Sequence, residues 1–274
     1  MSMLLHLQTV PARNGLLWIR HGFKVFQRKP LAMTGLFSVF LFLAFVLILI
    51  PGIGIIALLM MMPLLSLGFM LATHQVLQGQ TPTAAVFIAP LKLTPQRRST
   101  QLLLCALYAL ATLLISVLSA WVDGGAFERF QQLAGSGSAS AEQLAAAAAD
   151  PGLFWGAISR FGLAALLSVP FWHAPALVHW GGQGLMQALF SSTVGIWRNK
   201  GAFVYHALLW FTLVVLLGLV LSVLTSALGA ERLMPLIAMP IGLMLSTMFY
   251  ASLYFTFVDC FMFGAPRDVL DDKT

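Results

Sequence analysis

The chain has 274 residues, of which 59% are hydrophobic and only 9% are charged. Soluble globular domains carry about 25% charged residues, so this composition leaves too little polar surface for a protein surrounded by water. The net charge is +6, but most basic residues fall on one side of the predicted membrane spans, so nucleic-acid binding is not supported. The composition therefore predicts an all-α integral membrane protein with lipid as its solvent.

The first residues predict a surface helix followed by a retained membrane helix. About thirty residues, five of them Lys or Arg, precede the first apolar run, and no Ala-x-Ala-like cleavage site follows. Residues 14–29 form an amphipathic pattern, with Leu16, Trp18, Ile19, Gly22, Phe23 and Phe26 on one side. The opposite arc holds Arg13, Arg20, Lys24 and Arg28. Such a helix is typical of the membrane interface, with its cations toward anionic headgroups. A compatible alternative is that its apolar face packs on the protein's own membrane helices.

An apolar stretch from Leu31 to Thr73 is too long for one span and predicts a helical hairpin. At about 1.5 Å per residue it would measure roughly twice the hydrocarbon thickness. Pro51-Gly52 divides it into spans at 31–50 and 53–75, the second kinked by Pro63. The polar segment 78–100 follows, in which Thr81-Pro82 is expected to cap a short surface helix at 83–89.

The third span, 101–121, leads into the one substantial loop on the far side of the membrane, residues 122–152. This loop is acidic and contains the flexible sequence GSGSAS. Ser140 and Gln143 have the spacing of a capping box and predict a short helix that ends at Ala149. The loop is interpreted as a connector, with a periplasmic lid or docking element as the alternative.

Three further spans follow, at 153–180, 202–228 and 234–261. Pro170 and Pro175 predict bends in the first of them, and Pro240 lies in the last. Gly152 and Gly156 form a small-xxx-small pair for close helix approach. Residues 183–198 predict a second amphipathic helix. Its apolar face is expected to hold Leu185, Met186, Leu189, Phe190, Ile196 and Trp197, and its polar face Gln187, Ser191, Ser192 and Arg198.

The distribution of charge predicts the orientation of the chain. Twelve of the fifteen Lys and Arg residues fall on the N-terminal side of the spans, against Arg129, Arg160 and Arg232 on the other. The positive-inside bias therefore places both termini in the cytoplasm. The spans read as three hairpins, each preceded by a surface element with basic residues and each with proline in its second span.

The chain resembles a broad set of uncharacterised six-helix bacterial inner-membrane proteins. The resemblance rests on Ala174-Pro175-Ala176-Leu177-Val178, Gly182, Ala188-Leu189-Phe190-Ser191 and Trp197-Arg198-Asn199-Lys200. The opening residues Gly15, Trp18, Gly22-Phe23, Phe26 and Pro30 are similar to an uncharacterised proteobacterial family within that set. The membrane domain of some glycerophosphodiester phosphodiesterases is similar too. The resemblance implies the fold and an inner-membrane location, and it carries over no catalytic residue.

Ionisable residues within the spans are few and do not predict chemistry. Arg160 and Asp259 lie near span ends and are expected to reach an interface. His74, His173, His179 and His206 could ligate haem or a metal, but interfacial or hydrogen-bonded roles are favoured. Cys105 and Cys260 lie in apolar runs and are expected to be packing residues. No phosphate loop, zinc motif or nucleophile elbow is present, so we expect no enzyme, cofactor or metal.

Two functions from different classes remain. The first is a non-enzymatic membrane protein that binds anionic lipids or a membrane-protein partner through its cytoplasmic surface helices. The residues expected to act are Arg13, Arg20, Lys24, Arg28, Trp197 and Arg198. The second is a transporter or lipid translocase, whose cavity between the fourth and sixth spans would be lined by Ser168, His173, Ser246 and Thr247.

Overall fold

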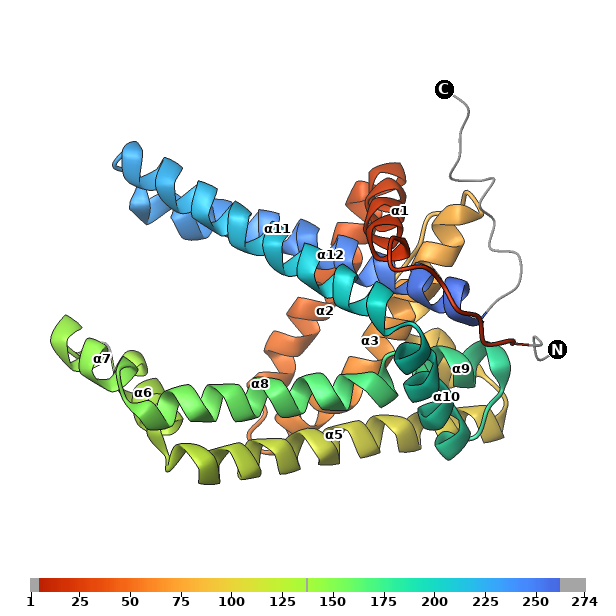
Figure 1. The fold of residues 1–274 in the computed structure, drawn as a ribbon, viewed down its shortest axis with the longest axis horizontal. Helices are drawn as coiled ribbons and strands as arrows, with labels where there is room; N and C mark the ends of the chain where they lie inside the picture. Colours follow the sequence, from red (N-terminus) through yellow and green to blue (C-terminus); the bar gives the residue numbers. More distant parts are fainter. Residues whose placement is uncertain (1–4, 137, 262–274) are drawn as a thin grey trace.

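The computed structural model describes residues 5–136 and 138–261, and within these ranges all regular structure is helical (Figure 1). The helices before the long loop are α1 (Asn14–Arg28), α2 (Pro30–Ile48), α3 (Ile53–Leu77), α4 (Ala85–Ile88), the 3-10 helix η1 (Ala89–Lys92) and α5 (Pro95–Asp123). Those that follow are α6 (Ala126–Gly135), α7 (Ala141–Ala148), α8 (Pro151–Phe171), α9 (Ala174–Gly181), α10 (Leu185–Arg198), α11 (Lys200–Ala227), the 3-10 helix η2 (Glu231–Leu233) and α12 (Met234–Phe261).

The described residues contain six stretches long and apolar enough to cross a membrane: α2, α3, α5, α8 together with α9, α11 and α12. They have 19 to 31 residues, and about 20 apolar residues suffice to span the hydrocarbon core. This confirms the all-α membrane fold with six spans. The spans pair as α2–α3, α5–α8 and α11–α12, and the short surface helices α1, α4 and α10 precede these pairs.

The first hairpin turns where Pro51-Gly52 predicts it. Gly52 adopts φ +73°, a left-handed conformation that favours glycine. Gly54 lies so close to α2 that an added Cβ would clash with the carbonyl oxygen of Leu47. Two glycines at this point therefore allow two apolar helices to reverse direction within a few residues.

The hairpins pack tightly at one end and diverge at the other. We call the end that holds α1, α9 and α10 the closed end, and the end that holds α6 and α7 the open end. Figure 1 shows the α11–α12 and α5–α8 pairs as two arms that separate toward the open end. The helix α3 contacts both α12 and α5, and the largest fully buried side chains include Trp18, Phe69, Leu177 and Phe257. The core therefore lies at the closed end, and both cysteines are buried and free within the bundle.

Two of the predicted helix starts differ clearly from those in the structure. The helix α5 begins at Pro95 rather than at residue 101, because Pro at its first position suits a helix start and Gln96–Thr100 continue it on the surface. The predicted Thr81-Pro82 cap is wrong: α4 begins at Ala85 with Ala84 before it and no side-chain cap. The short helix lies where Phe87 packs edge-on against Phe69.

The long far-side loop contains two helices. Ser140 and Gln143 form the predicted capping box, with Gln143 N donating to Ser140 Oγ at 3.1 Å and Ser140 N donating to Gln143 Oε1 at 2.9 Å. The helix that it opens, α7, ends at Ala148, close to the predicted end. The preceding helix α6 was not predicted, since its ten residues AFERFQQLAG carry no cap signal.

The α5–α8 arm is held together near the open end by one ion pair. Arg160 Nη2 lies 3.3 Å from Asp123 Oδ2, and its guanidinium also covers the ring of Phe127 at 4.0 Å. Gly156 and Gly152 face this point: an added Cβ would lie 2.4 Å from Asp123 Cβ at Gly156 and 2.7 Å from Asp123 O at Gly152. The small-xxx-small pair thus marks a real close approach, and Arg160 reaches a carboxylate.

Candidate functional site

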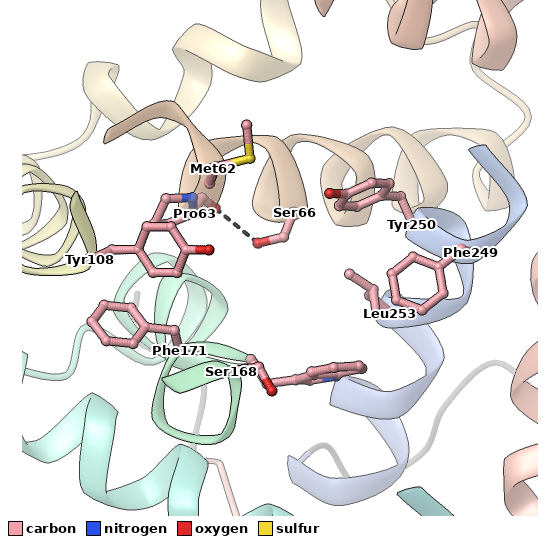
Figure 2. A pocket seen from close by; sticks show the side chains of 10 residues that line it. Met62, Pro63, Ser66, Tyr108, Ser168, Phe171, Phe249, Tyr250 and Leu253 are labelled. Carbon is pink, nitrogen blue, oxygen red and sulfur yellow. Dashed lines mark hydrogen bonds between the residues drawn. The ribbon is translucent and has the colours of Figure 1, made fainter. Parts of the chain in front are cut away.

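A pocket lies between α3, α5, α8 and α12 (Figure 2). Its volume is about 140 Å³. All ten described residues that line it are uncharged, and most are apolar or aromatic: Met62, Pro63, Ser66, Tyr108, Ser168, Phe171, Trp172, Phe249, Tyr250 and Leu253. Ser66 lies near the middle of α3, so the pocket lies near the centre of that membrane-crossing helix.

Hydroxyl groups are the polar groups of this pocket. Figure 2 shows the oxygens of Tyr108, Ser66 and Tyr250 turned toward the space between the helices. Ser66 Oγ donates to Pro63 O at 2.9 Å, and Ser168 Oγ donates to Ala165 O at 2.7 Å. The serine protons are therefore used within their own helices. The pocket can hold an apolar chain, and its phenolic hydroxyls could bond to a polar group at the end of that chain.

One wall of the pocket is a broken membrane helix. Sequence patterning predicts one bent span over 153–180, but α8 ends at Phe171 and α9 begins at Ala174. Pro170 and Pro175 lack the N–H groups that would bond to the carbonyls of Leu166 and Phe171, which weakens the helix on both sides of the break. Ser192 of α10 fills the gap: its hydroxyl donates to Val169 O at 2.9 Å and accepts from His173 N at 3.0 Å. A side chain that bridges two freed backbone groups in this way makes such a break tolerable inside a membrane.

The role of Ser192 corrects the predicted helical wheel of α10. We expected Ser192 on a polar face, but it is fully buried, together with Ala188 and Gly195. Small side chains let α10 lie against α8 and α9, and a Cβ at Gly195 would lie 2.6 Å from the ring of Phe261. The large apolar residues Met186, Phe190 and Trp197 point away from the bundle instead.

The four residues of the predicted cavity do not come together. Ser168 lines the pocket, whereas Ser246 is half-buried outside it and Thr247 is buried with its hydroxyl donating to Leu243 O at 2.7 Å. His173 is fully buried against the rings of Phe203, Phe257 and Phe261.

The hydrogen bonds around Thr256 show which ring nitrogen of His173 carries the proton. Thr256 Oγ1 donates its proton to Leu253 O at 2.8 Å, so it accepts from Trp172 Nε1 at 3.2 Å and from His173 Nε2 at 3.1 Å. Nδ1 of His173 is then an acceptor, and it has no partner among the described residues. This histidine is a hydrogen-bonded core residue.

The other predicted histidines have separate hydrogen-bond partners. His74 Nδ1 lies 2.9 Å from the hydroxyl of Tyr254, and His206 Nδ1 donates to Gly15 O at 3.2 Å. The carbonyl of His179 accepts from Arg97 Nη1 at 3.0 Å. Among the described residues, no group of three or more His, Cys, Asp or Glu side chains could hold a metal ion.

The helix α1 is docked on the bundle through polar anchors that the sequence did not reveal. Asp259 of α12 accepts hydrogen bonds from Asn14 Nδ2 and Trp18 Nε1, both at 2.8 Å. Gly15 and Gly22 let the backbone approach closely, since an added Cβ would lie 2.5 Å from Ala202 O and 2.8 Å from Met248 O, respectively. The apolar face of α1 thus packs on the protein's own helices, as the alternative interpretation proposed.

The cations of both surface helices remain on the outside. Arg13, Arg20, Lys24 and Arg28 of α1 are exposed, and so are Trp197 and Arg198 of α10. Lys200 Nζ lies 5.0 Å above the ring of Trp197. The predicted surface-binding residues are therefore presented outward on two helices that are themselves fixed to the closed end.

An extended segment before α1 completes the closed end. His6 N donates to Phe261 O at 3.0 Å and Gln8 N donates to Cys260 O at 2.8 Å, which satisfies the last carbonyls of α12. Asn199 holds this segment in place: its Oδ1 accepts from Val10 N at 2.7 Å and its Nδ2 donates to Gln8 O at 2.9 Å. Residues 5–12 gave no signal in the sequence because an extended cap has no periodicity.

Fold and surface together define a multi-spanning α-helical membrane protein with amphipathic helices at one end. A probable inner membrane protein of Burkholderia thailandensis is 32% identical over 270 residues, which cover 96% of this chain and 97% of that protein. The chain therefore belongs to the same family of inner-membrane proteins. No family model matches the chain, and no solved structure matches it.

Proposed function

We propose that this inner-membrane protein is non-enzymatic and binds anionic lipids at the cytoplasmic face of the membrane through α1 and α10. The observation that carries the proposal is the docking of α1, whose apolar face is buried against α11 and α12 while Arg13, Arg20, Lys24 and Arg28 are exposed. A basic residue near an anionic membrane surface contributes about 1 kcal/mol of attraction. Three of these residues lie on a helix that the bundle already holds, and Arg13 occupies its N-cap position, so binding does not carry the cost of folding that helix.

The helix α10 supports the same proposal with a different chemistry. Its outward residues Met186, Phe190 and Trp197 are suited to the acyl boundary, and Arg198 with Lys200 to the headgroups above it. The predicted orientation, with both termini in the cytoplasm, would bring these surfaces to the anionic leaflet; the C-terminal end itself lies outside the described residues.

The non-enzymatic part of the proposal is supported by the engagement of the acidic residues within the spans. Asp259 anchors α1, and Asp123 pairs with Arg160. Both therefore have structural partners. The likeness to the membrane domain of glycerophosphodiester phosphodiesterases stays a prediction, as does a membrane-protein partner.

The test compares two double variants that remove equal charge from opposite ends. In Arg20→Gln/Lys24→Gln the charge is lost from α1, and in the control Arg129→Gln/Arg232→Gln it is lost from exposed positions at the open end. Each protein is placed in nanodiscs of mixed phosphatidylglycerol and phosphatidylcholine, and the lipids retained after gentle release are counted by native mass spectrometry. We expect fewer phosphatidylglycerol molecules on the α1 variant and no change on the control. Equal retention by both would contradict the proposal.

A transporter or lipid translocase is the second candidate, favoured by the pocket beside the broken α8–α9 helix. Breaks of this kind near the bilayer midplane are common in transporters. Scrambling of fluorescent phospholipids in liposomes tests it. Activity above protein-free liposomes that Ser66→Phe abolishes, by filling the pocket, would favour translocation over surface binding.

A further inference from the structure

A second hollow lies at the closed end, where the chain passes from α9 to α10, and it is polar where the pocket of Figure 2 is apolar. Its volume is about 390 Å³, within the range of small-ligand sites. One wall is the start of α5, with Thr94, Gln96, Arg97 and Thr100. The other is the glycine-rich loop 181–184, whose sequence is Gly-Gly-Gln-Gly.

Arg97 brings a positive charge to this cavity. Its Nη1 donates to the carbonyl of His179 at 3.0 Å, which fixes the guanidinium at the end of α9. Gly182, at φ +65°, lies beneath it, and an added Cβ there would lie 2.8 Å from Nη2. Among the described residues, no carboxylate lies within ion-pair distance of Arg97. One planar donor group is thus held at the cavity wall, with no counter-ion among the residues that the structure describes.

Two helices begin at the same cavity. Thr94 and Gly184, which precede the first residues of α5 and α10, both line it, and neither helix has a side-chain cap. The first helical hydrogen bonds at these ends run from Arg98 N to Thr94 O and from Ala188 N to Gly184 O. The backbone N–H groups before these donors have no helical partner, and such helix starts favour anions.

Gln183 links the cavity to apolar surface. Its Oε1 is buried and has no hydrogen-bond partner among the described residues. Gln183 also borders a neighbouring hollow of about 170 Å³, which is lined mostly by apolar residues: Leu5, Leu7, Phe190, Val194 and Phe261, together with Ser191. A ligand with an anionic group and an apolar chain would match the polar cavity and the apolar hollow beside it.

We propose that the polar cavity binds a phosphate-bearing group. The guanidinium of Arg97 and the uncapped starts of α5 and α10 bind the phosphate oxygens. The phosphate belongs either to a lipid headgroup, with an acyl chain in the apolar hollow, or to a free phosphate ester. This site goes beyond the proposed function because it involves no cation of α1.

The test measures the melting temperature of the full-length protein in detergent with four compounds: dihexanoyl phosphatidylglycerol, dihexanoyl phosphatidylcholine, glycerol phosphate and inorganic phosphate. Arg97→Gln removes the guanidinium. Gly184→Leu adds bulk at the wall, at a position with φ −70° where an added Cβ would meet nothing within 4 Å. Arg98→Gln is the matched control, because this exposed cation neighbours Arg97 but does not line the cavity.

We expect phosphatidylglycerol to stabilise the native protein, with an affinity at least tenfold lower in Arg97→Gln and Gly184→Leu and unchanged in Arg98→Gln. Stabilisation by phosphatidylglycerol but not by glycerol phosphate assigns a lipid, and equal stabilisation assigns a free phosphate ester. The inference is overturned if none of the compounds stabilises the protein, or if Arg98→Gln weakens binding as much as Arg97→Gln does. If Arg97→Gln fails to fold, Gly184→Leu still decides. Loss of binding only in Arg20→Gln/Lys24→Gln would overturn the cavity site while supporting the proposed function.

Discussion

The closed and open ends of the bundle use apolar side chains in opposite ways. At the closed end Trp18, Phe69 and Phe257 are fully buried, whereas at the open end Trp121 is 77% exposed and Phe154 is 61% exposed. In lipid, burying an apolar side chain against another helix gains little, because hydrocarbon surrounds it either way. Close packing and hydrogen bonds must therefore decide which helices associate, and these are concentrated at the closed end.

If the two ends differ in this way, replacing tryptophan by alanine should have a large effect at the closed end and a small one at the open end. Trp18→Ala removes a fully buried ring that packs on Phe203 and His206 and bonds to Asp259. We expect a loss of about 3–5 kcal/mol in the free energy of unfolding, measured by titration with SDS in mixed micelles. Trp121→Ala is the matched control and should leave that free energy nearly unchanged. Equal losses would show that the open end is packed as tightly.

A second comparison uses glycine. Gly22→Val places a Cβ 2.8 Å from Met248 O, which pushes α1 off α12, whereas at Gly162 an added Cβ meets nothing within 4 Å. We expect Gly22→Val to cost about 2–3 kcal/mol of unfolding free energy through overpacking. Gly162→Val carries the same change in helix propensity, so the difference between the two variants isolates the close contact. A cost at Gly162 that matches the cost at Gly22 would refute the close contact.

Ser192→Ala tests the hydroxyl that bridges the broken helix. It leaves Val169 O and His173 N without their partner, so we expect a loss of about 1–2 kcal/mol and faster hydrogen exchange at the amide of His173. Thr193→Ala is the control on the same helix, because its exposed hydroxyl bonds only to Leu189 O. Slow exchange at the amide of His173 in the Ser192→Ala variant would mean that another group accepts its hydrogen bond.

The smallest effect is expected in the loop at the open end. Arg129 Nη2 lies 3.4 Å from Asp150 Oδ2, and the two side chains are 60% and 38% exposed. Such a pair contributes about 0–1 kcal/mol, so Arg129→Gln should hardly change the melting temperature. Arg160→Gln should lower it more, because Asp123 would keep its charge in a buried position. A larger decrease in melting temperature for Arg129→Gln than for Arg160→Gln would mean that the ion pair in the loop stabilises the open end more than the buried pair does.

The sequence predicted what depends on hydropathy and local caps: the six spans, the turn at Pro51-Gly52 and the capping box at Ser140. Asp259 shows where such reasoning ends. It was expected to reach the interface, but it binds Asn14 and Trp18, which lie more than 240 positions earlier in the chain. Ser192 is a second example. A helical wheel shows that its side chain is polar, but it cannot show that this side chain bonds to Val169 O and His173 N of the broken α8–α9 helix. Long-range hydrogen bonds leave no periodic signal.

The cap on α12 has a consequence for the order in which the protein is assembled. The backbone groups of His6 and Gln8 bond to the last carbonyls of α12, and α1 packs on α11 and α12. During synthesis these early residues emerge long before their partners exist. The helix α1 must therefore wait, with its apolar face uncovered, until the sixth span has entered the membrane. Closure of the bundle is a late event, and a nascent chain that stops before α12 lacks the main docking surface of its first helix.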